Sequence, residues 1–202
     1  MVTIIDYGMG NIASIQKMLK KIGYDSELTN NRETILNSQK IILPGVGAFD
    51  YGMKNLKDQD LIQVLRYKAI EEKTPLLGIC LGMQLLGKSS EEGEEEGLSL
   101  IDFNTIKFKF DNLKLKIPHM GWNYIEYNSD SKLFKDMYEE TRYYFVHSYY
   151  VENNDSYTIA RANYGFDFSA AVRKDNILGV QFHPEKSHKF GMKLLQNFVE
   201  EF

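Results

Sequence analysis

The first half of the chain alternates short apolar runs with longer segments in which apolar residues recur every three or four positions. A short apolar run is typical of a strand buried on both faces, and the longer spacing is typical of a helix with one buried face. The expected strands are residues 2–5, 26–29, 40–43 and 75–79, and the expected helices are residues 12–22, 60–72 and 81–86. Strands that alternate with helices predict a parallel sheet covered by helices on both faces.

The second half of the chain, beyond Gly87, lacks long helical patterns until near its end. Its alternating or aromatic short runs predict largely antiparallel strands at residues 105–110, 113–117, 122–127, 142–150, 157–163, 168–173 and 177–182. A brief helix is expected at residues 133–137, and a closing helix at residues 188–202. The predicted fold class is therefore α/β, with a central, mostly parallel sheet flanked by helices and an additional antiparallel section in the second half.

The composition fits a single globular domain over residues 1–202, since the sequence contains no internal repeat, low-complexity linker or convincing domain boundary. A hydrophobic content of 43% excludes a disordered chain, and a net charge of -4 provides no general attraction for nucleic acid or an anionic membrane. The N-terminus lacks the pattern of a secretion signal, and no apolar run is long enough to span a bilayer. We therefore expect neither export nor membrane insertion.

The chain contains one cysteine, Cys80, which excludes an internal disulfide and a zinc site built from several thiolates. A free thiol persists in reducing compartments, so a cytoplasmic location is expected. The glycine pair Gly8 and Gly10 follows a predicted strand but lacks the third glycine of a dinucleotide-binding fingerprint. We therefore expect neither a cofactor nor a metal.

Cys80 lies in the turn between the strand at residues 75–79 and the helix at residues 81–86. Gly78 and Gly82 flank it in the pattern of a nucleophile elbow, in which small neighbours permit a strained turn that exposes the nucleophile. Unpaired backbone N–H groups at the start of the following helix favour the thiolate, which is the form that attacks. Most lone cysteines are small buried hydrophobic residues, but this context favours a nucleophile.

A second loop with unusual backbone requirements follows the strand at residues 40–43. Gly45 and Gly47 surround Val46, and two glycines permit backbone angles that could point an N–H group into a pocket, as an oxyanion site requires. A tight turn between a strand and a helix is equally compatible with these residues. Because this loop and Cys80 both follow parallel strands, both should lie at the same edge of the sheet, where they could meet.

The last predicted strand leads into His183, Pro184 and Glu185. In an extended segment, residues two apart point the same way, and Pro184 favours an extended path at His183. Glu185 could then orient the imidazole and leave its other nitrogen free to exchange a proton with Cys80. Cys80, His183 and Glu185 would form a nucleophilic triad. The other histidines that could compete for the role of base are His119, His147 and His188.

These motifs resemble those of a known enzyme family. Residues 78–84 (GICLGMQ), together with residues 183–185 (HPE), resemble the class I, triad-type glutamine amidotransferases. Three further segments, at residues 6–11, 44–49 and 118–123, resemble the glutaminase subunits of imidazole glycerol phosphate synthase. The similarity covers essentially the whole chain and includes residues 144–149.

The resemblance implies a glutaminase in which the Cys80 thiolate attacks the side-chain amide carbon of glutamine. It also implies that His183 protonates the departing ammonia, that Glu185 orients His183, and that water hydrolyses the glutamyl thioester to glutamate. The implied oxyanion donors are the N–H groups of Leu81 and of the loop at Val46 and Gly47. The residues implied to hold glutamine are Gly47, Gln84, Glu92, Ser148 and Tyr149, the last two through their backbones.

Glu92 belongs to an acidic run that by itself predicts a solvated loop. The resemblance instead implies that Glu92 contacts the substrate, while residues 94–96 are still expected to be solvated. The resemblance also implies a partner, because family members pass ammonia to a barrel-shaped cyclase subunit within a heterodimer. The cyclase forms imidazole glycerol phosphate and an aminoimidazole carboxamide ribotide for histidine and purine synthesis. The positions that match the interface are Asn11, Met120, Trp122, Tyr144 and Lys186.

Three alternatives stay open at this point. A close paralogue would have the same glutaminase residues but would supply ammonia for an amidino group on a bacterial surface sugar. A cysteine version of the α/β hydrolases would also have an elbow, but its acid precedes the histidine in the chain and could not be Glu185. A regulatory subunit with an idle pocket would not need the complete triad. For a glutaminase, low activity in isolation is expected, because releasing ammonia without an acceptor wastes glutamine.

Overall fold

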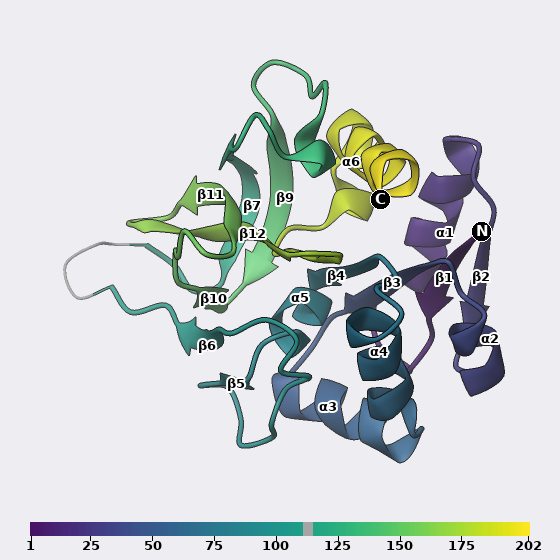
Figure 1. Ribbon diagram of the computed structural model, residues 1–202. Helices are drawn as coiled ribbons and strands as arrows, with labels where there is room; N and C mark the ends of the chain where they lie inside the picture. Colours follow the sequence, from purple (N-terminus) through teal and green to yellow (C-terminus); the bar gives the residue numbers. More distant parts are fainter. Residues whose placement is uncertain (111–114) are drawn as a thin grey trace.

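The computed structural model describes residues 1–110 and 115–202, and its central feature is a mixed sheet (Figure 1). Adjacent parallel strands form one half of this sheet, in the spatial order β2 (Ser26–Thr29), β1 (Val2–Ile5), β3 (Lys40–Gly45), β4 (Leu76–Cys80) and β13 (Ile177–Val180). The four strands predicted in the first half of the sequence are thus confirmed. The last strand of the chain, β13, inserts beside β4.

An antiparallel section extends the sheet beyond β13, as the second half of the sequence predicts. Its strands are β12 (Asp167–Lys174), β11 (Thr158–Asn163), β10 (Tyr149–Val151), β8 (Glu126–Tyr127), β6 (Asn104–Lys107) and β5 (Ser89–Ser90), of which β5 and β6 pair in parallel. A separate antiparallel pair is formed by β7 (His119–Tyr124) and β9 (Arg142–His147).

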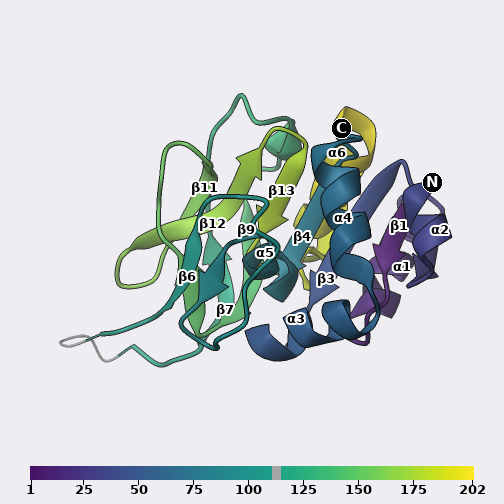
Figure 2. The ribbon, with the colours of Figure 1, turned by 60° about the horizontal axis from the view of Figure 1, so that its bottom comes forward.

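Helices cover both faces of the parallel half, as Figures 1 and 2 show. One face is covered by α1 (Ile12–Lys21) and α6 (His188–Glu201), and the other by α2 (Arg32–Leu36), α3 (Phe49–Asp58), α4 (Leu61–Ile70) and α5 (Leu81–Leu85). Successive residues of β3 point to opposite faces of the sheet. Ile42 packs in the core with α1 and α6, whereas Ile41 and Leu43 pack in the core with α2, α3, α4 and α5. This alternation explains why the strands appear as continuous apolar runs.

Several predicted elements differ from the structure. The helices α2 and α3 are absent from the prediction: α2 is five residues long and buries only Ile35, whereas the apolar residues of α3 do have helical spacing, which the prediction misses. The predicted strand at 142–150 is divided at Ser148 into β9 and β10, which pair with different partners. Of the predicted strand at 113–117, residues 113–114 lie outside the described residues, and residues 115–117 form no strand. The predicted brief helix at 133–137 is a 3-10 helix at Lys132–Phe134.

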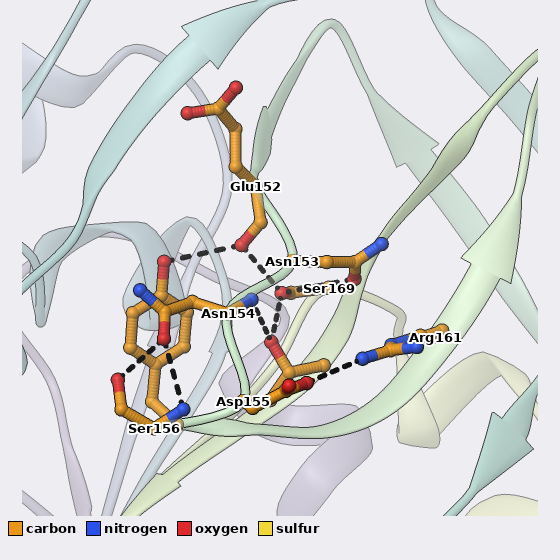
Figure 3. Close-up of polar contacts among 9 residues, drawn as sticks. Glu152, Asn153, Asn154, Asp155, Ser156, Arg161 and Ser169 are labelled. Atoms are coloured by element: carbon orange, nitrogen blue, oxygen red, sulfur yellow. Dashed lines mark hydrogen bonds and ion pairs between the residues drawn. The ribbon is translucent and has the colours of Figure 1, made fainter.

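The loop between β10 and β11 is held by a compact set of hydrogen bonds (Figure 3). The side chain of Asn154 accepts the N–H of Ser156 at 2.9 Å, which closes a turn. The hydroxyl of Ser169, on β12, donates to the carbonyl of Glu152 at 2.9 Å and accepts a hydrogen bond from the hydroxyl of Thr158 at 2.7 Å. These contacts tie the end of β10 to β12.

In residues 1–110 and 115–202, no helix is both long enough and apolar enough to cross a membrane.

Candidate active site

The two loops singled out in the sequence lie side by side at the carboxyl edge of the parallel strands. Gly45, at the end of β3, is the register partner of Cys80, at the end of β4. Parallel pairing of adjacent strands therefore brings residues that are far apart in sequence into one site, as expected for an α/β sheet.

Cys80 forms a strained turn between β4 and α5. Its φ is 54° and its ψ is -111°, in a region that residues with a side chain rarely adopt. The two flanking glycines are required by close packing: a Cβ on Gly82 would lie 1.9 Å from the carbonyl oxygen of Leu43, and one on Gly78 would lie 2.7 Å from the carbonyl oxygen of Gly82. The glycines thus allow the neighbouring backbone to pack tightly against the turn, as the elbow pattern predicts.

His183 and Glu185 form a buried pair, with Nδ1 of the imidazole 2.8 Å from Oε1 of the carboxylate and side chains that are 1% and 2% exposed. His183 is extended, as predicted, but Pro184–Lys186 forms a 3-10 helix, so the prediction of an extended path to Glu185 is wrong. The turn closes because the N–H of Lys186 and the hydroxyl of Ser187 both donate to the carbonyl of His183. Glu185 reaches the imidazole from within this turn.

The electrostatic balance around His183 favours the protonated imidazole. Burial alone would lower the pKa of His183, but the side chains of Cys80 and Glu185 outweigh it and raise the pKa to about 10. Nε2 of His183 is buried and has no hydrogen-bond partner among the described residues. One ring nitrogen is therefore fixed by Glu185, and the other is free to exchange a proton.

A pocket of about 350 Å³ adjoins Cys80 and His183. The other predicted site residues that line it are Val46, Gly47, Leu81, Gln84, Glu92, Ser148 and Tyr149. Glu185 does not line the pocket but bonds to His183. The sequence analysis did not assign Pro118 or Val146, which also line the pocket, because nothing in their local pattern indicates chemistry.

A larger cavity, of about 830 Å³, lies beside α3 and α4 and is lined in part by Asp50, Lys57 and Arg66. None of the predicted site residues lines it. We therefore place the candidate site at the smaller pocket, which the predicted nucleophile Cys80 and the predicted base His183 both line.

Glu92 is held inside the site by its neighbours. Its Oε2 accepts the N–H of Phe49, at the start of α3, at 2.9 Å. Burial raises the pKa of Glu92, which the Phe49 N–H partly opposes and Asp50 reinforces. Asp50 in turn accepts the N–H groups of Glu94 and Glu95, each at 3.0 Å. The loop at residues 94–96 is thus anchored to α3, and the prediction that it is merely solvated is wrong for Glu95, which is half-buried.

The three other histidines have different surroundings. Nδ1 of His119 lies 2.9 Å from Nε2 of His147, whose Nδ1 lies 2.7 Å from the carbonyl of Tyr149. Burial lowers the pKa of His119 to about 4 and is the main cause that lowers the pKa of His147 to about 3, so both are neutral at pH 7. His188 stacks on Trp122 with ring centroids 5.7 Å apart. His147 lines the pocket but has no free ring nitrogen, which favours His183 as the base.

Four of the five predicted interface residues form one contiguous surface. Trp122 on β7 is the register partner of Tyr144 on β9, and the ammonium of Lys186 lies 5.6 Å above the Tyr144 ring. Met120 is 62% exposed and Trp122 is 44% exposed on the same face of β7. Asn11 is half-buried at the start of α1, which packs against the turn that carries Lys186.

Across residues 1–110 and 115–202, no group of three or more His, Cys, Asp and Glu side chains is arranged to hold a metal ion.

Comparison with known proteins gives consistent results. The sequence model of the family described as glutamine amidotransferase class-I matches residues 3–202. The chain is 57% identical to imidazole glycerol phosphate synthase subunit HisH 2 of Methanococcus maripaludis over 100% of both chains. It is 48% identical to subunit HisH 2 of Pseudomonas aeruginosa over 99% of both, and 43% identical to subunit HisH of Leptospira interrogans over 98% of this chain and 99% of the relative.

Solved structures support the fold. A protein described as a glutamine amidotransferase aligns with a TM-score of 0.77 at 19% identity and covers 99% of this chain and 98% of its own. PurLQS from Thermotoga maritima aligns with a TM-score of 0.71 at 18% identity, over 99% of this chain and 97% of its own. Similarity at this level of identity concerns the arrangement of helices and strands alone.

Proposed function

The chain belongs to the class I glutamine amidotransferase family, and from this premise we propose that it is the glutaminase subunit, HisH, of an imidazole glycerol phosphate synthase. It hydrolyses glutamine to glutamate and ammonia, and the ammonia serves histidine biosynthesis. The observation that carries the proposal is that Cys80, His183 and Glu92 line one pocket. Glu185, outside the pocket, is hydrogen-bonded to Nδ1 of His183. Family membership also removes the support for a cysteine α/β hydrolase.

The chemistry begins with the Cys80 thiolate, which attacks the side-chain amide carbon of glutamine and forms a tetrahedral oxyanion. The protonated His183 then donates its Nε2 proton to the amide nitrogen, the carbon–nitrogen bond breaks, and ammonia leaves a glutamyl thioester. His183, now neutral, takes a proton from water as the water oxygen attacks the thioester carbon. The carbon–sulfur bond breaks, and glutamate and the Cys80 thiolate are released.

Two backbone segments are suited to stabilise the oxyanion. The N–H of Leu81 is at the first position of α5, where helical N–H groups have no partner within the helix. The loop at Val46 and Gly47 follows the β3 strand beside Cys80, and Gly47 has a φ of +105°, which a residue with a side chain rarely adopts. N–H groups from both segments would hold the oxyanion as it forms.

The pocket suits a small, zwitterionic amino acid. Its volume of about 350 Å³ is at the small end for ligand pockets, and the Glu92 carboxylate provides a negative charge to meet the α-ammonium group of glutamine. Gln84 and the backbones of Gly47, Ser148 and Tyr149 complete the substrate contacts in this proposal. The reaction requires no metal or cofactor.

The proposed partner is a barrel-shaped cyclase subunit that forms a heterodimer with this chain and consumes the ammonia. The surface formed by Met120, Trp122, Tyr144 and Lys186, with Asn11 beside it, would contact the cyclase. Exposed aromatic side chains are frequent at the centres of protein interfaces, and here they lie on the β7–β9 pair, which also carries the pocket residues Val146 and His147. We assign the single-domain chain of 202 residues to the cytoplasm.

The test is glutamate release from glutamine by the purified chain, alone and with a histidine-pathway cyclase subunit and its ribotide substrate. We expect slow release by the chain alone, strong stimulation by the loaded cyclase, and loss of both in Cys80→Ala. Cysteine-dependent basal release without stimulation would instead indicate the paralogue that serves amidino-sugar synthesis. No release under any condition would refute the glutaminase assignment.

A further inference from the structure

Gln181 is a buried polar residue to which the proposed mechanism assigns no role. It follows β13 directly, and because Val180 is the register partner of Ile79, Gln181 lies beside Cys80 in the next position of the two parallel strands. Its side chain is 0% exposed, and its main-chain N–H donates to the carbonyl of Ala170 at 2.9 Å. A buried amide must find partners for both ends of its side chain, so these partners indicate what it does.

The two ends of the Gln181 amide contact two residues of the site. Nε2 of Gln181 lies 3.8 Å from Sγ of Cys80, within the range of an N–H···S hydrogen bond. Oε1 of Gln181 accepts a hydrogen bond from Nε2 of Gln84 at 2.9 Å. The amide therefore bridges the nucleophile and a residue that lines the glutamine pocket.

The orientation of this amide follows from the hydrogen bonds around it. The backbone carbonyl of Tyr149 can only accept, and it lies 3.3 Å from Nε2 of Gln84, so the NH₂ end of Gln84 must point this way. The same NH₂ group then donates to Gln181, which requires the oxygen of Gln181 on that side. The NH₂ end of Gln181 is thereby directed at the sulfur of Cys80.

The Tyr149 carbonyl is itself held in place by a second donor. His147 is neutral, and its Nδ1–H donates to this carbonyl at 2.7 Å, while its Nε2 accepts from Nδ1–H of His119 at 2.9 Å. Nε2 of His119 then accepts from the side-chain amide of Asn123, on β7, at 3.2 Å. The chain of hydrogen bonds leaves each of these groups a single consistent orientation.

Two protein contacts of the sulfur favour opposite protonation states. A thiol can donate to the carbonyl of Val146, which lies 4.0 Å from Sγ, but a thiolate cannot. An N–H donor such as that of Gln181 binds a thiolate more strongly than a thiol, because the acceptor is then charged. Such a donor therefore favours the thiolate, which is the reactive form.

We propose that Gln181 is a further catalytic residue, which donates its side-chain N–H to Sγ of Cys80 and stabilises the thiolate. The contact and the stabilisation stand on the geometry alone, whereas their use in glutamine hydrolysis rests on the proposed function. The amide is neutral and stays in place through the reaction, so the donor is available whenever the thiolate is regenerated.

The test is the pH dependence of alkylation of Cys80 by iodoacetamide, which reports on this site alone because the chain has one cysteine. Gln181→Met removes the donor at similar side-chain volume. We expect the midpoint of the alkylation profile to rise by about one pH unit, and the rate to fall about tenfold at pH values below both midpoints. An unchanged midpoint in the folded variant would refute the proposal.

Asn197→Leu is the matched control, because it also removes a buried amide, one that donates to the carbonyls of Leu133 and Lys135 and does not contact Cys80. Its alkylation midpoint should equal that of the wild type. If Gln181→Met fails to fold, Gln181→Asn serves instead, since it keeps the amide but shortens the side chain by one methylene. The same rise is expected there, and its absence would count equally against the proposal.

Alkylation needs no glutamine, so the two hypotheses fail separately. A wild-type chain that releases no glutamate even with the loaded cyclase would refute the proposed function, while a raised midpoint in Gln181→Met would still establish the donor. If the glutaminase is active, Gln181→Met should move the acidic limb of its pH–rate profile upward by about the same one unit and recover most of the rate at high pH. A merely structural role for Gln181 would lower the rate equally at every pH.

Discussion

Cys80 illustrates at the scale of a residue how strain and packing are used together. Its backbone conformation is unfavourable, and it persists because neighbouring strands and α5 hold both sides of the turn. Gly82 packs so closely on the carbonyl of Leu43 that no side chain fits. The sequence pattern of glycines predicted this turn because the requirement for a missing Cβ is local and can be recognised without the rest of the fold.

Glu185 leads to a prediction about pH. The pKa of His183 is raised above its ordinary value, so the stability that protonated His183 contributes is fully present below about pH 6.5 and is lost as the pH rises through about 10. The free energy of unfolding of the wild type should therefore fall as the pH rises from neutral to alkaline. Glu185→Gln should reduce this dependence, because part of the cause that raises the pKa of His183 is removed.

Urea unfolding at about pH 6.5, 8 and 9.5 measures this effect. At the lowest of these pH values the free energy of unfolding of Glu185→Gln should be lower by about 1–2 kcal/mol, since a neutral amide oxygen replaces the carboxylate as acceptor of the imidazolium N–H. Glutamine hydrolysis should fall on the order of 100-fold. The exposed Glu96→Gln is the control and should follow the wild-type pH dependence; equal slopes in all three proteins would contradict the interpretation.

At the scale of elements, the site depends on the break between β9 and β10. β9 pairs with β7 and carries Val146 and His147, while β10 pairs with β6 and β12 and begins at Tyr149. Ser148, between them, has its carbonyl bonded to the N–H of Phe108 and lies open to the pocket. Continuous apolar and aromatic character made this region look like one strand, because a change of pairing partner leaves no mark in local periodicity.

Ser169 provides a test of how firmly β10 must be anchored. Ser169→Ala removes the donor to the Glu152 carbonyl and the acceptor of the Thr158 hydroxyl, both in the cluster of Figure 3. Because Ser169 is fully buried, we expect a loss of about 1–3 kcal/mol in the free energy of unfolding, measured in urea. Ser89→Ala, at an exposed serine, should change it by less than about 0.5 kcal/mol, and a similar loss in both would refute the anchoring role.

At the scale of the whole molecule, residues of the pocket and of the proposed interface lie on the same β7–β9 pair, where Met120 is the register partner of Val146. His119 and His147 form the buried register pair at one end of it, and Trp122 and the half-buried Tyr144 form a more exposed pair nearer its middle. Docking of a partner on this surface would therefore act directly on the strands whose continuation lines the pocket. This arrangement fits an enzyme that is expected to be slow until its ammonia acceptor is present.

Trp122 reports on that assembly, because it is the only tryptophan and is 44% exposed. Its fluorescence emission should shift to shorter wavelength when a histidine-pathway cyclase subunit binds and excludes water. Trp122→Ala should weaken assembly by about 30-fold, the effect expected for an aromatic residue at the centre of an interface; because this variant lacks the reporter, its affinity is measured by titration calorimetry.

The control for this titration is Tyr67→Ala, because Tyr67 is 48% exposed on α4, away from the β7–β9 pair (Figure 1). We expect it to bind as the wild type does. If the tryptophan emission stays constant on saturation with the cyclase, or if both variants bind equally well, the proposed interface is in the wrong place.

The sequence by itself determined the parts of this protein that depend on local spacing. Apolar runs specified the four strands of the first half, the glycines around Cys80 specified the elbow, and the short distance between His183 and Glu185 made their pairing predictable. Each of these features results from steric or burial requirements within a few residues, so it can be predicted from the local sequence pattern.

Only the tertiary structure decided which distant groups meet. Insertion of β13 beside β4 brings Gln181 and His183 to Cys80; the sequence motif predicted the role of His183, but the contact between Gln181 and Cys80 leaves no local signal. The turn at Pro184–Lys186, the anchoring of Glu92 on α3 and the pairing of His119 with His147 likewise depend on elements that pack together from far apart in the chain. Strand order is set by the burial of whole faces, which is a property of the assembled sheet and not of any single segment.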